Sequence, residues 1–257
     1  MTAPAPLTAP STLRHKVASS CPGGGIGRRA GFRYLWPQGF GSSSLLLGTM
    51  ASSMSLHLHK GDLPDGLDLG PLVAIDSETM GLQPARDRLC LVQLSAGDGA
   101  CHLVQLAQGA YEAPNLKKLL TDPKVTKLFH FARFDIAMFR RHLGVVTEPL
   151  YCTKIASKLT RTFTDKHGLK DLCKELLGVE LSKQQQSSDW GAPNLSEEQL
   201  RYAASDVLHL HRLKEKLDVM LKREGRMAIA EACFRFLPVR AELDLLGWGD
   251  EDDIFAH

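Results

Sequence analysis

Short apolar runs separated by turn residues divide the chain from about residue 55 onward into alternating candidate strands and helices. Leu72 to Ile75 is an uninterrupted apolar run, a pattern typical of a strand that is covered on both faces. Leu89 to Ser95 and Ala100 to Leu106 flank Gly97-Asp98-Gly99, which predicts a hairpin. A further apolar run, Val125 to Phe131, predicts another strand.

Apolar residues three or four positions apart predict helices between and after these strands. The capping-box sequence Ser196-Glu-Glu-Gln199 marks the start of the longest one. The predicted helices are 115–120, 133–142 ending at Gly144, 153–159, 169–177, 196 to about 223, 226–236 and 238–246, with an edge strand at 148–152. This order predicts an α/β fold with a mixed five-stranded sheet, one strand antiparallel, and helices on both faces.

Four acidic residues stand inside or beside these apolar segments, where an ionised carboxylate is costly unless it is paired or bound to a cation. Asp76 and Glu78 lie two residues apart at the end of a strand and therefore point to the same face. Asp135 follows a strand and opens a helix, while Tyr202 and Asp206 are four apart on a helix and share a face. Oxygen ligands without nearby Cys or His favour Mg²⁺ or Mn²⁺ over zinc. The sequence therefore predicts a metal site.

Each of these residues also has an ordinary structural interpretation. An acid after a strand is often the N-cap of the next helix, and this applies to Asp135 taken alone. A tyrosine and an aspartate on one helical face are often a packing residue and a solvated charge. The joint occurrence of all five residues favours the metal site.

Three sequence motifs in a fixed order resemble those of the DEDD 3′-5′ exonucleases. Asp76-Ser-Glu-Thr-Met-Gly-Leu82 resembles D-x-E-x-x-G-L, His130-Phe-Ala-Arg-Phe-Asp135 resembles H-x-x-x-F-D, and Tyr202-Ala-Ala-Ser-Asp206 resembles the Y-x-x-x-D of the tyrosine branch. Ser77 departs from the threonine that is common between the first two acids. The segments between these motifs resemble the corresponding segments of ribonuclease D. They are Asp87-Arg-Leu-Cys-Leu-Val-Gln-Leu94, Leu169-Lys-Asp-Leu172 and Ser188-Asp-Trp190. The resemblance implies the ribonuclease H-like (DnaQ-like exonuclease) fold.

The resemblance also implies chemistry. Two divalent cations, Mg²⁺ or Mn²⁺, would activate water and stabilise the leaving 3′ oxygen. Asp76, Glu78 and Asp206 would hold the first ion, Asp76 and Asp135 the second, and Tyr202 would orient the attacking water. The expected substrate is a single-stranded RNA 3′ end, hydrolysed to 5′-mononucleotides, with tRNA precursors as a family-level expectation. The alternatives are the same chemistry on DNA, and a nucleic-acid-binding module without catalysis.

A second set of residues is predicted to contact the substrate. His130 either touches substrate or satisfies a backbone group, and the structural role is favoured. Trp190 either stacks a base or anchors the packing of a loop, and packing is again favoured. The full predicted set is Thr79, Met80, Gly81, Leu82, His130, Phe134, Lys183 and Trp190. Because the longer ribonuclease D proteins carry C-terminal helical domains, this short form is expected to rely on a homodimer or a partner to hold RNA.

Composition separates residues 1–54 from the exonuclease domain predicted at 55–250 and the tail 251–257. The leader is rich in Pro, Ser and Gly, and without the five basic residues before Met50 the totals are 26 basic against 29 acidic residues. It is interpreted either as a transit peptide or, preferably, as a translated transfer-RNA gene with the true start at Met50 or Met54. In the second interpretation Gly25-Ile-Gly-Arg-Arg-Ala30, Ser42-Ser-Ser44 and Gly48-Thr-Met50 encode a leucine tRNA's D-arm, TTCGA loop and terminal CCA.

The six cysteines form no C-x-x-C pair and are interpreted as thiols in a reducing compartment, which predicts a cytoplasmic protein. No apolar stretch approaches the ~20 residues that a membrane span needs. The sequence therefore predicts no contact with a membrane.

Overall fold

The computed structural model of the protein describes residues 54–182, 184, 185, 187–249 and 254, so the predictions made for residues 1–53, Lys183 and most of the tail lie outside the described part. The strands are β1 (Ser55–Lys60), β2 (Leu72–Thr79), β3 (Leu89–Ser95), β4 (Ala100–Gln105), β5 (Thr126–Phe129) and β6 (Leu150–Cys152). The helices are α1 (Pro114–Thr121), α2 (Ala132–Leu143), α3 (Thr153–Thr160), α4 (Leu169–Leu172), the π-helix η1 (Cys173–Leu177), α5 (Glu197–Leu208), α6 (Leu210–Arg223) and α7 (Met227–Leu245).

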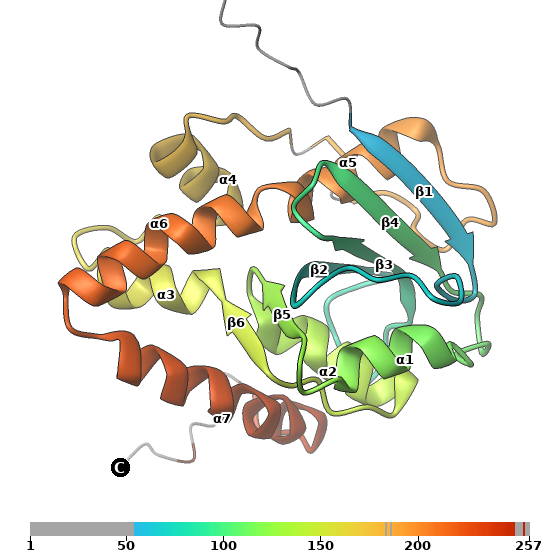
Figure 1. Ribbon diagram of the computed structural model, residues 1–257. Coiled ribbons are helices and arrows are strands. Elements are labelled where there is room, and N and C mark those ends of the chain that lie inside the picture. The colour runs from blue at the N-terminus through green and yellow to red at the C-terminus, as the bar shows by residue number, and fades with distance from the viewer. Residues whose placement is uncertain (1–53, 183, 186, 250–253, 255–257) are drawn as a thin grey trace, which may run out of the picture. The chain divides into compact units, whose positions relative to one another are not determined.

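One mixed sheet runs through the described residues in the order β1-β4-β3-β2-β5-β6 (Figure 1). Strand β3 is antiparallel to both of its neighbours, and the remaining pairs are parallel, which confirms the predicted single antiparallel strand. The sheet has six strands where the sequence predicted five. The missed strand is β1, whose side chains are mostly exposed because it pairs on one side only, with β4. Its apolar pattern is correspondingly weak.

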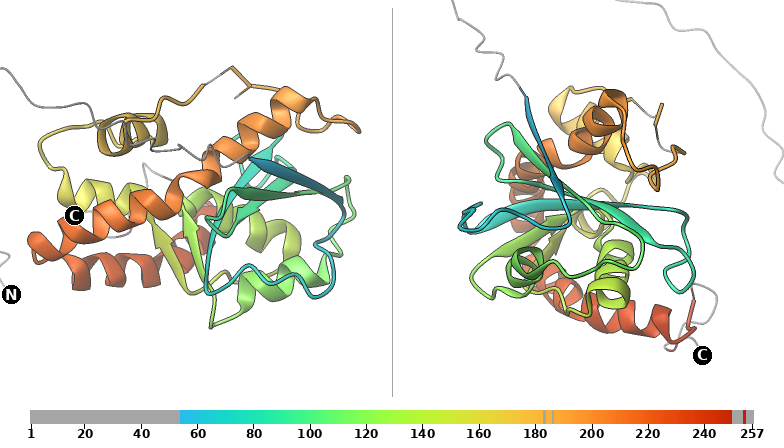
Figure 2. Two further views of the ribbon diagram at one scale, coloured as in Figure 1. Left: turned by 45° about the horizontal axis from the view of Figure 1, so that its top comes forward. Right: turned by 90° about the vertical axis from the view of Figure 1, so that its right-hand side faces the viewer.

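Helices cover both faces of the sheet, as predicted. Helix α5 packs against β2, β3 and β4, whereas α2 contacts β2 and β3 from the other face (Figure 2). The central strands account for this arrangement: every residue of β3 is buried, and Val73, Ala74 and Ile75 of β2 are completely inaccessible. These largely apolar strands stabilise the sheet only when helices shield both sides. Among the described helices, none is long and apolar enough to cross a membrane.

Three predicted helical segments differ from the structure, and the first is 169–177, which is α4 followed by the π-helix η1. The segment predicted as one helix from Ser196 to about Arg223 is broken at His209 into α5 and α6. The apolar positions continue through the break without a Gly or Pro to mark it, since both helices bury one face. Conversely, the two helices predicted around residue 237 are a single helix α7 that contains Pro238. A proline removes one hydrogen-bond donor, and here the packing of α7 against α2, α3 and β6 maintains the helix.

The register of the sheet determines which residues of β2 lie next to the start of α2. Leu72 pairs with Thr126 and Ala74 with Leu128, so β2 continues beyond the end of β5 at Phe129. The last residues of β2 therefore lie level with the turn that leads into α2. Helix α2 follows this turn directly and ends at Gly144, which adopts the left-handed conformation that favours glycine.

Candidate metal centre and substrate cleft

Three of the predicted carboxylates converge although 130 positions separate the first from the last. Asp76 and Glu78 project from the same face of β2, and Asp206 comes from α5, which packs on that face. One oxygen from each of the three lies within 4.8 Å of the others. The pairing of β2 with β3 and the docking of α5 onto the sheet together create this cluster.

Asp135 approaches the cluster from the other side of β2. It belongs to the first turn of α2 and is almost completely buried. The Ser77 hydroxyl donates a hydrogen bond of 2.6 Å to Asp135 Oδ1. Because Ser77 lies between Asp76 and Glu78 on β2, its side chain faces α2 while theirs face α5. The small residue between the two acids thus connects Asp135 to the strand that carries them.

Gln93 is a site residue that was not singled out from the sequence. It pairs directly with Asp76 across the antiparallel β2–β3 ladder and is completely buried. Its side-chain amide donates to Asp76 Oδ2 at 3.1 Å and lies 3.5 Å from Glu78 Oε1. In the sequence, Gln93 stands out as a polar residue within the apolar segment Leu91-Val-Gln-Leu94. A buried amide at such a position is expected to have a hydrogen-bond partner.

Burial makes the ionised state of these acids costly. It raises the pKa of Asp206 to about 7 and that of Asp135 to about 7, with the Ser77 hydrogen bond opposing the rise at Asp135. Burial and the neighbouring carboxylates raise the pKa of Asp76 and of Glu78 well above their ordinary ranges. Within the described residues, none of the four carboxylates forms an ion pair with Lys or Arg. In the part of the chain that the structure describes, no protein cation neutralises the cluster.

The donor set fits divalent cations. Several carboxylate oxygens face one another with no His or Cys nitrogen or sulfur among them, which is the ligand chemistry of Mg²⁺ and Mn²⁺. A bound cation would lower the raised pKa values by supplying the missing positive charge. Buried, mutually repelling acids that remain in a folded protein are best explained by such an ion.

Tyr202 lies one helical turn before Asp206 on α5 and borders the same cleft. Burial, followed by the charge of Asp206, raises the pKa of its phenol. The hydroxyl is therefore protonated at neutral pH and acts as a hydrogen-bond donor. This state suits the orientation of a water molecule better than the removal of its proton.

The acids form the floor of a cleft of about 590 Å³. Of the residues predicted to contact substrate, those within the described part all line it: Thr79, Met80, Gly81, Leu82, His130, Phe134 and Trp190. Ser187 and Ser188, from the polar run 183–188 that the sequence suggests as a phosphate-contacting loop, line it as well, and so does Phe131, which the sequence did not single out. Met80 and Leu82 are exposed at its mouth.

Two of these cleft residues have clear structural contacts. The Thr153 hydroxyl donates to the Phe129 carbonyl and accepts from His130 Nδ1 at 2.9 Å. Burial lowers the pKa of His130 to about 3, so the ring is neutral. Trp190 is 2% exposed and packs at a tilt against Tyr202, with ring centroids 6.2 Å apart. Both placements agree with the structural roles favoured from the sequence, and a contact of either residue with substrate stays a prediction.

A family model described as 3′-5′ exonuclease matches residues 62–222, which include all of the acids and Tyr202. The chain belongs to this 3′-5′ exonuclease family. The chain is 40% identical to ribonuclease D of Gluconacetobacter diazotrophicus over 157 residues, covering 61% of this chain and 39% of that protein. Ribonuclease D of Escherichia coli is 31% identical over 173 residues, covering 67% of this chain and 45% of that protein. The chain thus spans less than half the length of these curated relatives.

Solved structures show the same relationship. NrnC of Brucella melitensis with bound Mg²⁺ superposes on this chain with a TM-score of 0.76 at 56% identity, covering 79% of this chain and all of that one. NrnC bound to pGG gives a TM-score of 0.77 at 58% identity, with 80% and 100% coverage. E. coli RNase D gives 0.59 at 28% identity, with 67% and 45% coverage. These matches confirm the family resemblance and the fold class predicted from the sequence.

Proposed function

We propose that this exonuclease is a divalent-metal-dependent exoribonuclease that removes nucleotides from RNA 3′ ends and releases 5′-mononucleotides. The observation that carries the proposal is the convergence of Asp76, Glu78 and Asp206, with oxygens within 4.8 Å of one another, in a cleft beside Asp135 and Tyr202. A binding module would gain nothing from four buried carboxylates, because they repel the phosphates it must hold. Metal-dependent phosphodiester hydrolysis requires them.

The four acids divide between two proposed cation positions. Asp76, Glu78 and Asp206 would hold one ion, and Asp76 with Asp135 would hold the other. Two such ions would supply an activated water and a counter-charge for the leaving 3′ oxygen. The Mg²⁺ in the NrnC structure supports this class of metal.

The protein's own side chains position this chemistry. The Tyr202 phenol, held neutral by its raised pKa, donates a hydrogen bond that orients the attacking water towards the phosphorus. Gln93 fixes the rotamer of Asp76 from the neighbouring strand, and Ser77 does the same for Asp135. Such partners of metal ligands typically improve metal affinity 10- to 100-fold.

Two comparisons support RNA as the substrate. The curated relatives are ribonuclease D proteins, and NrnC, whose whole solved chain this protein covers, was solved with pGG. We infer that the cleft accepts short single-stranded RNA ends in the same way. Trimming of tRNA precursors, and a homodimer that would improve the grip on such RNA, remain predictions.

The decisive experiment follows the release of nucleotides from RNA and DNA oligomers of matched sequence, labelled at either end, with Mg²⁺, Mn²⁺ or EDTA. A stepwise ladder from 5′-labelled RNA that requires the metal supports the proposal. Glu78→Gln should abolish the ladder, whereas the matched surface variant Glu231→Gln should not. Preference for DNA, or cleavage that persists after thorough chelation, would overturn the proposal.

A further inference from the structure

Three histidines lie together on the two strands at one edge of the sheet. His57 and His59 are two residues apart on β1 and point to the same face, and His57 pairs with His102 across the parallel β1–β4 ladder. The ring of His102 stacks against both of the others, with centroids 4.9 Å from that of His57 and 5.3 Å from that of His59. We call these three residues the β1–β4 histidine cluster.

The cluster lies on the sheet face opposite the one that carries Asp76 and Glu78. Gln93, whose amide contacts Asp76, pairs with Leu103 of β4, so Leu103 points to the same face as the two acids. His102 precedes Leu103 on the strand and therefore points to the other face. Any ion that the histidines hold is thus separate from the proposed catalytic ions.

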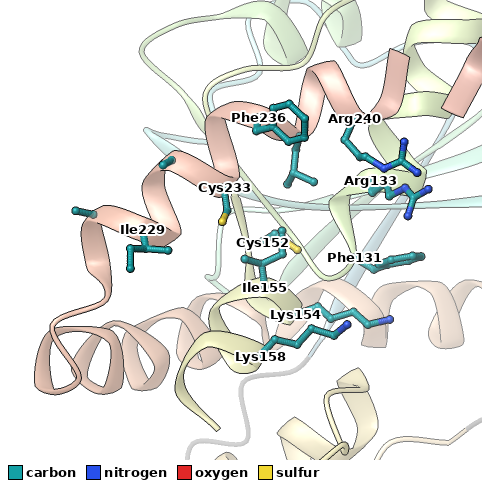
Figure 3. Close-up of a pocket in the computed structure, with 13 residues that line it drawn as sticks. Phe131, Arg133, Cys152, Lys154, Ile155, Lys158, Ile229, Cys233, Phe236 and Arg240 are labelled. Carbon is teal, nitrogen blue, oxygen red and sulfur yellow. The ribbon is translucent and has the colours of Figure 1, made fainter. Parts of the chain in front are cut away.

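The cluster is also separate from the cavity between α3 and α7, which Figure 3 shows. Strands β1 and β6 are the two edges of the sheet, and α3 follows β6 directly. The described residues that line this cavity include Cys152, Ile155 and Ile229, and none of them is a histidine. The histidine cluster at the β1 edge therefore needs an explanation of its own.

Two ring nitrogens of the cluster have nearly the spacing of neighbouring ligands on one metal ion. His59 Nε2 lies 3.0 Å from His102 Nδ1. Metal–nitrogen bonds of about 2.0–2.1 Å place two nitrogens of a tetrahedral site roughly 3.3 Å apart. A small rotation of the two rings would direct both lone pairs to one ion. The His57 ring is exposed, so rotation about its side-chain torsions would bring a third nitrogen.

The environment keeps these rings neutral, which is the state in which imidazole binds metals. Burial, followed by the charge that His57 can carry, lowers the pKa of His59. Burial and the charges of His57 and His59 lower the pKa of His102, whereas Asp98 opposes this shift. Two neutral rings share only one N–H in their direct contact. A metal ion between them would instead be bound by a lone pair from each ring.

We propose that the β1–β4 histidine cluster binds a transition-metal ion of the class that prefers imidazole, namely Zn²⁺, Ni²⁺ or Cu²⁺. His59 and His102 supply two ligands, His57 supplies a third, and water completes the coordination. Imidazole nitrogen selects these ions, whereas the carboxylate oxygens of the catalytic cleft select Mg²⁺ or Mn²⁺. This inference does not depend on the proposed exoribonuclease function.

An ion held by His59 and His102 would cross-link β1 to β4. Strand β1 pairs with β4 alone and is mostly exposed, so it has few other contacts that hold it in the sheet. A ligand that binds only the folded state at a hundredfold excess over its Kd should raise the thermal midpoint by about 5–10 °C for a domain of this size. The amide hydrogens of β1 should then exchange more slowly with solvent.

The experiment titrates Zn²⁺ into the full chain by calorimetry with Mg²⁺ in large excess, and records the paramagnetic resonance spectrum of bound Cu²⁺. The spectrum should show coupling to nitrogen, which carboxylate ligands do not give. His59→Gln and His102→Gln should remove this coupling and weaken Zn²⁺ binding by at least the about 10- to 100-fold that loss of a ligand's supporting residue costs. His57→Gln should weaken binding less, because water can replace its ring.

The matched control is His167→Gln, since His167 lies outside the cluster and bonds to the Ser157 hydroxyl. It should bind Zn²⁺ like wild type, and all four variants should hydrolyse RNA with Mg²⁺ at the wild-type rate.

The proposal is overturned if His59→Gln and His102→Gln bind Zn²⁺ as tightly as wild type, or if bound Cu²⁺ shows oxygen ligands only. Unchanged thermal midpoints in EDTA would show that the variants keep the fold. Should either variant fail to fold, amide exchange of wild-type β1 with and without Zn²⁺ decides the question, because a cross-link must slow it and unchanged exchange refutes the site. None of these outcomes affects the proposed exoribonuclease function, which the RNA assay tests separately.

Discussion

Neutralising one acid of the metal centre should stabilise the metal-free protein while destroying its activity. The perturbation is Asp206→Asn, which keeps the shape of the side chain and removes its charge. Burial raises the pKa of Asp206 from its ordinary value of 3.8 to about 7. Each pKa unit corresponds to about 1.4 kcal/mol, so ionised Asp206 costs up to ~4 kcal/mol of folding free energy. Because Asp206 is partly exposed and water screens its charge, we expect on the order of 2–4 kcal/mol.

The sign of the pH dependence follows from proton linkage. A carboxyl whose pKa is higher in the folded state binds more protons when folded, so stability decreases as pH rises from about 4 and levels off above about 7. The advantage of Asp206→Asn over wild type should therefore be greatest at pH 8. At pH 5 most of it should be gone, because wild-type Asp206 is then protonated when folded.

Thermal unfolding in EDTA tests this reasoning. For a domain of this size each kcal/mol shifts the midpoint by about 2–4 °C, so the variant should unfold roughly 4–16 °C above wild type at pH 8. Saturating Mn²⁺ should raise the wild-type midpoint more than that of the variant, and the variant's turnover should decrease by orders of magnitude. Asp165→Asn, an exposed acid outside the cleft, is the matched control. An equal or lower midpoint for Asp206→Asn in EDTA at pH 8 would refute the electrostatic account.

Three further substitutions address the residues around the ligands. Ser77→Ala removes the hydrogen bond that lowers the pKa of Asp135, so the acidic limb of the pH–rate profile should move to higher pH, and Ser77→Thr should restore it. Gln93→Leu should raise the Mn²⁺ concentration for half-maximal activity about 10- to 100-fold, because the ligand loses its fixed rotamer; an unchanged concentration would contradict this. Gly81→Ala should lower both the thermal midpoint and the activity, since an added Cβ would lie 2.2 Å from Asp87 Oδ2; a fully active, equally stable variant would show that the cleft wall yields easily.

The sequence by itself determined the fold class and predicted which residues form a metal centre. Strands such as Leu89–Ser95 and helix ends such as Gly144 follow from local patterns of apolar residues, glycines and caps, which act over a few positions. The five site residues were predicted from the spacing of acids at strand ends together with the resemblance to the exonuclease motifs. The structure brings Asp76, Glu78, Asp135, Tyr202 and Asp206 to one cleft, and their catalytic role stays a prediction.

Only the tertiary structure decided how these residues reach one another. The pairing of β2 with β3 places Gln93 opposite Asp76. The docking of α5 brings a carboxylate oxygen of Asp206 within 4.8 Å of those of Asp76 and Glu78. The break at His209 and the continuation of α7 through Pro238 likewise depend on packing partners distant in the chain. The cavity between α3 and α7 likewise depends on how these two helices pack, which no local pattern in the sequence shows. Local patterns fix which face of an element is apolar, whereas the contacts between faces arise only when the whole chain packs.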